Sequence, residues 1–151
     1  MSRQLNNHPS AIQRYDWPLA QLPGLSHDNQ SQLLECGITT TGQLIQKANT
    51  PETRQALANQ LQIHIQYVKK WVALADLARI PSVGCQYCGL LLHAGVCSVT
   101  QLAQIPPHRL HQQILRLHVA TMQRRDLCPS VEQVSLWIQQ ARSILDFRLK
   151  N

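Results

Sequence analysis

The sequence LPGLSHDNQSQLLECGITTTGQL at residues 22–44 recurs in altered form as IPSVGCQYCGLLLHAGVCSVTQL at residues 80–102. Six of the 23 aligned positions are identical: Pro23/Pro81, Leu33/Leu91, Leu34/Leu92, Gly37/Gly95, Gln43/Gln101 and Leu44/Leu102. Trp71 and Trp137 also correspond once an insertion is allowed in the second copy. Scattered leucines match readily by chance. A proline, a glycine and a later tryptophan in the same order indicate a duplicated unit instead. The duplication alone does not show that the two copies share a function.

Each copy predicts the same local structure. Ser26 opens a helix to Cys36, and the glycine at 37 ends it because glycine adopts the left-handed conformation that often follows a helix. Thr40 or Thr41 then caps a short helix through Leu44. The second copy predicts a turn at 80–84, a helix to 94, a stop at Gly95 and a short helix from Ser98 to 103. Further helices are predicted at 51–61, 64–79, 106–117 and from 130 onward, with a connector at 118–129. Thr50 and Ser130 are the expected caps of the first and the last of these helices.

The composition favours an all-α fold. Hydrophobic residues make up 44% and charged residues 15%, with only three Trp, three Tyr and one Phe. The core must therefore be mostly aliphatic, as suits packed helices. We expect one compact helical domain at 22–149, built from repeats 22–79 and 80–149, after an N-terminal arm at 1–21. Tyr15 and Trp17 are the expected anchors of the arm.

The net charge of +6 is concentrated toward the C-terminus. The net charge is zero over residues 1–50, +2 over 51–100 and +4 over 101–151. Such a distribution favours polyanions or acidic protein surfaces, although it also suits an ordinary solvated surface. The polar N-terminus has no signal-peptide pattern, no apolar run is long enough to cross a membrane, and the five cysteines fit a reducing compartment. We therefore expect a cytoplasmic protein that does not enter a membrane.

The order of turn, helix, glycine stop, short helix and Trp-bearing helix resembles a known family. KWVALADLARIPSVG at residues 70–84 and RRDLCPSVEQV at 124–134 carry the resemblance. They are similar to the domain of unknown function 4332 family, a tandem helix-hairpin-helix group, over about Leu22 to Leu145. The resemblance implies an all-helical fold of helix-hairpin-helix ancestry and no established activity.

Helix-hairpin-helix turns bind phosphate through backbone amides in a Gly-hydrophobic-Gly turn, often with a nearby basic residue. Both copies depart from that pattern. The turn at 24–26 ends in serine, and the turn at 82–84 begins with serine. Where a basic residue would help, the chain has Asp28 in the first copy and Gln86 in the second. The second turn is therefore the better candidate.

The leading hypothesis is a non-catalytic module that binds DNA or RNA backbone without reading the bases. The candidate contacts are Lys69, Lys70, Gly84, Gln86, Arg109, Arg116, Arg124 and Arg125. The histidines at 108, 111 and 118 lie near them in sequence and would add charge at low pH. The alternative is a protein–protein adaptor, which the degenerate turns and Asp28 favour.

Four potential metal ligands lie within 13 residues: Cys85, Cys88, His93 and Cys97. Their spacing would require a zinc site to break the predicted helix, so we expect no metal. Cys85 and Cys88 could form a redox pair, but the expectation is that Cys88 serves as a small core residue. No catalytic motif is present in the sequence, so we expect no enzyme activity, cofactor or small-molecule substrate.

Overall fold

The computed structural model describes residues 16–121 and 128–150, with side chains described up to residue 146. Within those residues the chain forms eight α-helices, a short 3-10 helix and an isolated bridge between Pro18 and Thr40. The elements are η2 (Leu19–Gln21), α2 (His27–Glu35), α3 (Thr41–Lys47), α4 (Pro51–Leu61), α5 (Ile65–Ala78), α6 (Gly84–His93), α7 (Val99–Gln104), α8 (Pro107–Ala120) and α9 (Val131–Lys150). The prediction of a compact all-α domain is confirmed.

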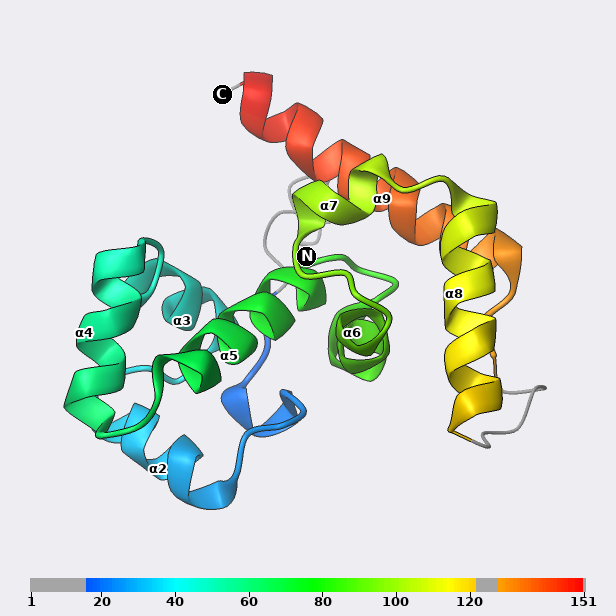
Figure 1. The fold of residues 1–151 in the computed structure, drawn as a ribbon. Coiled ribbons are helices and arrows are strands. Elements are labelled where there is room, and N and C mark those ends of the chain that lie inside the picture. Colours follow the sequence, from blue (N-terminus) through cyan, green and yellow to red (C-terminus); the bar gives the residue numbers. More distant parts are fainter. Residues whose placement is uncertain (1–15, 122–127, 151) are drawn as a thin grey trace, which may run out of the picture.

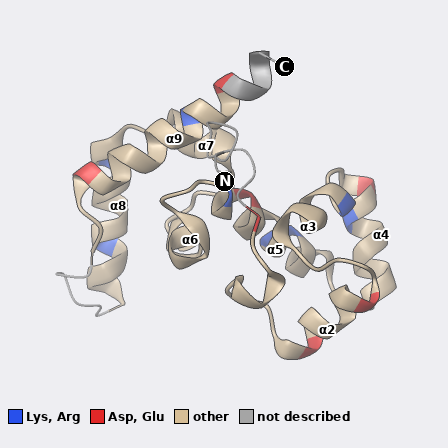
Figure 2. Cartoon of the chain, turned by 180° about the vertical axis from the view of Figure 1, so that it is seen from behind, with Lys and Arg blue, Asp and Glu red and all other residues tan. Residues whose placement is uncertain are grey.

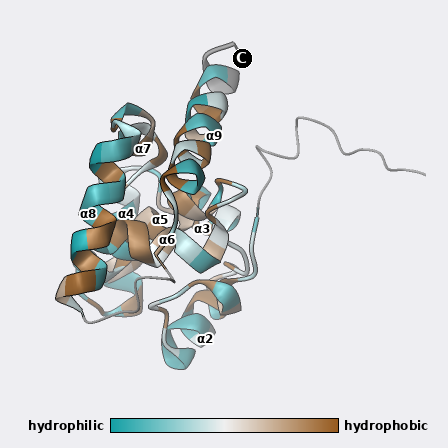
Figure 3. Ribbon diagram, turned by 90° about the vertical axis from the view of Figure 1, so that its right-hand side faces the viewer, coloured by the Kyte–Doolittle hydropathy of each residue, from teal (hydrophilic) through white to brown (hydrophobic). Residues whose placement is uncertain are grey.

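Two Trp-bearing helices organise the packing (Figure 1). Helix α5 packs against α3, α4 and α6, and helix α9 packs against α7 and α8. Helix α6 lies between α5 and α8. Helices α8 and α9 each carry both hydrophilic and hydrophobic residues along their length (Figure 3). No described helix has both the length and the apolar character needed to cross a bilayer.

The two copies end their first helices with the same hydrogen bonds. The amide of Ile38 donates to the carbonyl of Leu33 at 2.9 Å, and the amide of Val96 donates to that of Leu91 at 2.9 Å. In each copy a glutamine side chain, from Gln43 or Gln101, then accepts an amide hydrogen bond just before the next helix. The predicted glycine stops and the predicted caps of the two short helices are confirmed by these contacts and by the helix bounds.

Residues 16–22 are attached to the helical domain, and two of their side chains reach its core. The indole N–H of Trp17 donates to the carbonyl of Ala78 at 2.8 Å. The carboxylate of Asp16 accepts the amide of Gly42 at 2.7 Å in the first turn of α3, and the side chains of Leu19 and Leu22 are buried. The predicted anchoring by Trp17 is confirmed, while Tyr15 lies outside the described residues.

The connector predicted at 118–129 is partly wrong, because α8 continues to Ala120. His118, the first residue of the predicted connector, is buried on the inner face of this helix. The segment 118–120 is therefore helical, although the helix was predicted to end at 117. Residues 122–127 of the connector lie outside the described part. After it, the amide of Gln133 donates to the hydroxyl of Ser130 at 3.1 Å, as the predicted cap of the last helix requires.

Two glycines with positive φ provide a matched test of this packing. A Cβ on Gly84 (φ 52°) would lie 3.0 Å from the Trp17 ring, whereas a Cβ on Gly95 (φ 97°) would meet nothing within 4 Å. We expect Gly95→Ala to lower the free energy of unfolding by about 1–2 kcal/mol through backbone strain alone. Gly84→Ala should lower it further, by about 1 kcal/mol or more, because the ring must also move. Urea denaturation of both variants measures the difference, and equal losses would show that Trp17 does not pack on Gly84.

Candidate nucleic-acid interface

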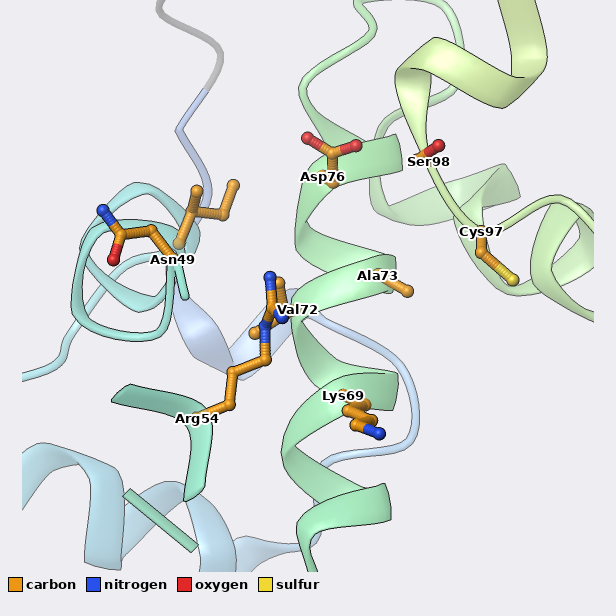
Figure 4. A pocket seen from close by; sticks show the side chains of 9 residues that line it. Asn49, Arg54, Lys69, Val72, Ala73, Asp76, Cys97 and Ser98 are labelled. Atoms are coloured by element: carbon orange, nitrogen blue, oxygen red, sulfur yellow. The ribbon is translucent and has the colours of Figure 1, made fainter. Parts of the chain in front are cut away.

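A basic groove lies beside α5, on the side of α5 that faces α4 and the loop before α7. Its volume is about 470 Å³. Its lining residues are Ile45, Asn49, Arg54, Lys69, Val72, Ala73, Asp76, Cys97 and Ser98. Figure 4 shows the Arg54 side chain reaching from α4 toward α5, over Val72, while Lys69 projects from α5 itself. The groove therefore combines cations from two helices with polar groups from two loops.

The single carboxylate of the groove is already neutralised. One oxygen of Asp76 accepts a hydrogen bond from the Arg79 guanidinium at 2.6 Å, and the other accepts the amide of Val99 at 2.8 Å. This is the one ion pair found in the described part of the chain. Arg54 and Lys69 consequently have no carboxylate partner there. The groove carries an uncompensated positive potential, which attracts anions.

Lys70 serves a different part of the surface. A Cβ built on Gly24 would lie 3.7 Å from the Lys70 Nζ, so this ammonium group lies over the first hairpin turn. Gly24 itself is exposed and has a φ of 79°. The basic residue that the first copy lacks after its turn is therefore supplied by α5.

The turn at 82–84 is bound to α9. The Ser82 amide donates to the Gln140 side chain at 2.9 Å, and the Ser82 carbonyl accepts the indole N–H of Trp137 at 3.1 Å. The Gly84 amide donates to the Ile80 carbonyl at 2.9 Å, and the residue is buried under Trp17. A phosphate cannot reach amides that are already bonded and covered. Gly84 is therefore removed from the set of candidate contacts.

The structure does not bring the predicted basic residues together. Arg109 and Arg116 are exposed on α8, on the other side of α6 from α5, as Figures 1 and 2 show. Gln86 is exposed on α6 and faces α8 instead of the groove. Arg124 and Arg125 lie outside the described residues.

The histidines near the α8 arginines differ in exposure. His108 is exposed, His111 is half-buried and His118 is only 8% exposed. The expectation that His118 belongs to the basic surface is wrong, because α8 turns this side chain inward.

Sequence reasoning missed four polar residues of the groove: Asn49, Arg54, Asp76 and Ser98. Arg54 is 15 positions before Lys69 in the chain, and only the packing of α4 on α5 brings the two cations to one groove. One signal in the sequence could have helped to place Arg54. The cap at Thr50 fixes where the helix begins, and Arg54 lies in the first turn after it. Ser98 was identified as a cap, and its place at the groove follows from the packing of the second copy on α5.

The cysteines lack the features of a reactive pair. Burial raises the pKa of the Cys85 thiol to about 11. Burial, and then the neighbouring Cys85, raise the pKa of Cys88 to about 12. Reactive cysteines depend on a lowered thiol pKa. Among the residues that the structure describes, no three His, Cys, Asp or Glu side chains are grouped so as to hold a metal ion.

These raised pKa values predict alkaline destabilisation. Cys88 binds its proton more tightly in the folded chain than at its ordinary pKa of 9.0. Its contribution to stability is complete below pH 9 and is lost as the pH rises toward 12. Between pH 9 and 11 we expect the free energy of unfolding to fall by about 1–2 kcal/mol through this thiol. Chemical denaturation at both pH values measures the fall. Cys88→Ala should show a smaller one, and an equal fall in the variant would contradict this assignment.

The comparisons with known proteins identify the family and no more. No curated protein and no solved structure matches the chain. A family model described as Domain of unknown function (DUF4332) matches residues 23–144, most of the chain, and the chain therefore belongs to that family.

Proposed function

We propose that this domain is a non-catalytic module that binds the sugar–phosphate backbone of nucleic acid through the groove beside α5. The observation that carries the proposal is that Arg54 and Lys69 line the same groove. These two cations come from different helices, and neither has a carboxylate partner in the described chain. Phosphate contacts of this kind supply affinity and position without base specificity. We also propose that the protein is cytoplasmic, as its sequence leads us to expect.

The surroundings of the two cations suit a phosphate. The amide of Asn49 and the hydroxyl of Ser98 line the same groove and can donate hydrogen bonds to phosphate oxygens. Because Asp76 is held by Arg79 and Val99, its carboxylate does not repel an anion at full strength. Lys70 provides a separate positive charge over the turn at 24–26. The turn at 82–84 is buried and does not support phosphate binding. The proposal therefore depends on side chains of the groove and not on backbone amides of a turn.

Fluorescence anisotropy with labelled duplex and single-stranded oligonucleotides of mixed sequence tests this proposal. We expect binding at about 50 mM salt, similar affinities for unrelated sequences, and a steep loss of affinity by about 200 mM salt. Absence of binding to any of these nucleic acids at the lower salt concentration would overturn the proposal.

A protein–protein adaptor is the second candidate. The observation in its favour is the exposure of large hydrophobic side chains, with Tyr67 57% exposed on α5 and Leu34 45% exposed on α2. Helix α2 also carries Asp28 and Glu35 and no Lys or Arg, in contrast to α8 (Figure 2). If the anisotropy experiment fails, affinity capture with wild-type protein and a Leu34→Ser, Tyr67→Ser variant tests the adaptor. A partner retained by both proteins equally would contradict a role for these side chains.

A further inference from the structure

A second cavity lies between α6 and α8, on the opposite side of α6 from α5. Its volume is about 480 Å³. Tyr87 and Leu90 of α6 and Leu117 of α8 form apolar walls, while Gln86, His93, His118 and Thr121 are the polar lining residues. The Tyr87 ring packs on the buried Trp137 ring at a centroid distance of 5.0 Å. One wall of the cavity is therefore fixed by the core.

His118 is the unusual group in this cavity. It is only 8% exposed, and neither ring nitrogen has a hydrogen-bond partner in the part of the chain that the structure describes. Buried polar groups in folded proteins are nearly always paired, because an unpaired donor or acceptor loses its water without replacement. An unpaired imidazole at the edge of a cavity therefore indicates that something else completes its hydrogen bonds.

The lining residues define the chemistry of that partner. A neutral imidazole has one N–H donor and one acceptor nitrogen, and a hydroxyl or amide group can pair with either. Among the described residues, no Asp, Glu, Lys or Arg lines the cavity, so no permanently charged side chain there balances a full charge on a ligand. Mixed apolar walls with a few polar groups, at this volume, are typical of small-molecule sites.

We propose that the α6–α8 cavity binds a small uncharged molecule with an aromatic or aliphatic body and one hydroxyl or amide group that pairs with His118. The body lies against Tyr87, Leu90 and Leu117. Solvent does not reach the His118 nitrogens in this structure, so pairing with the ligand requires the ring to turn about its Cβ–Cγ bond toward the cavity. This site is separate from the Arg54–Lys69 groove and does not depend on nucleic-acid binding.

Three matched probes test the proposal by nuclear magnetic resonance of the imidazole nitrogens: benzamide, toluene and benzoate. Benzamide should bind and shift the His118 ring signals. Toluene, which lacks the polar group, should bind about tenfold more weakly, the factor that one buried hydrogen bond contributes. Benzoate, which is charged, should also bind more weakly. The proposal is overturned if toluene or benzoate binds as tightly as benzamide, or if benzamide shows no binding up to about 10 mM, the affinity range of so small a ligand.

Two variants separate ligand pairing from a merely structural role. His118→Phe keeps an aromatic ring and removes both unpaired nitrogens, so it should fold and lose the preference for benzamide over toluene. Val119→Ala changes an exposed neighbour on α8 that does not line the cavity, and it should bind all three probes like wild type. A His118→Phe protein that keeps the wild-type preference would overturn the proposed pairing, and the probe series on the wild-type chain tests the site even if this variant is unstable.

Discussion

Replacing Trp137 with alanine is expected to lower the free energy of unfolding by about 3–5 kcal/mol. The side chain is completely buried, and its indole N–H donates to the Ser82 carbonyl at 3.1 Å. The substitution leaves a cavity beside Tyr87 and an unpaired carbonyl in the second hairpin turn. Losses of this size are a large part of the total stability of an ordinary domain, so the melting temperature should fall markedly. Urea denaturation followed by circular dichroism measures the change.

Two further variants show whether the loss comes from this packing. Trp137→Phe keeps an aromatic ring and loses the N–H, so it should be less destabilising than Trp137→Ala. Leu136→Ala changes the neighbouring position on the same helix, which is 42% exposed, and should alter stability by no more than about 0.5 kcal/mol. If Trp137→Ala and Leu136→Ala had similar effects, α9 could not be the helix that anchors the second copy.

Changing Arg54 and Lys69 together to glutamine is expected to weaken nucleic-acid binding by about 10- to 100-fold at low salt. Charge-assisted hydrogen bonds to phosphate are stronger than neutral ones, and both cations face one groove. Screening at the exposed surface keeps the effect from being larger. Anisotropy titrations of the wild type and the double variant with the same duplex at about 50 mM salt measure it.

The matched control is the double change of Arg109 and Arg116 to glutamine on α8. Each pair removes two positive charges from the net charge of +6, so a general attraction to polyanions falls equally in both. The groove model predicts that the α8 variant loses much less affinity than the α5-groove variant. Equal losses would show that binding depends on total charge and not on the groove. Both variants alter surface residues, and circular dichroism verifies that they are folded.

The helices and their ends could be predicted because their signals are local. Glycine at 37 and 95, threonine at 50 with Pro51, and serine at 98 each act within a few residues of their own position. The helix at 51–61 has the predicted bounds for that reason. The end of α8 was missed because His118 was assigned to the connector, whereas it is buried and the helix continues until Thr121 donates its amide and hydroxyl to the Leu117 carbonyl.

The candidate site was predicted less well because it depends on contacts between distant segments. Lys69 was identified, but its partner Arg54 comes from a different helix. The turn at 82–84 was considered a candidate phosphate contact from its sequence alone. The glutamine and tryptophan that occupy its polar groups come from α9, more than 50 residues later. Such long-range hydrogen bonds decide whether a hairpin is available to a ligand.

The central claim, that Arg54 and Lys69 contact phosphates directly, is tested most directly by the salt dependence of duplex binding. The logarithm of the binding constant falls linearly with the logarithm of salt concentration, with a slope of about −0.9 for each phosphate neutralised. If both cations contact phosphates, the slope of the Arg54→Gln, Lys69→Gln variant should be shallower than that of the wild type by about 1.8, which is about 0.9 for each lost contact. Parallel lines for the two proteins would contradict it.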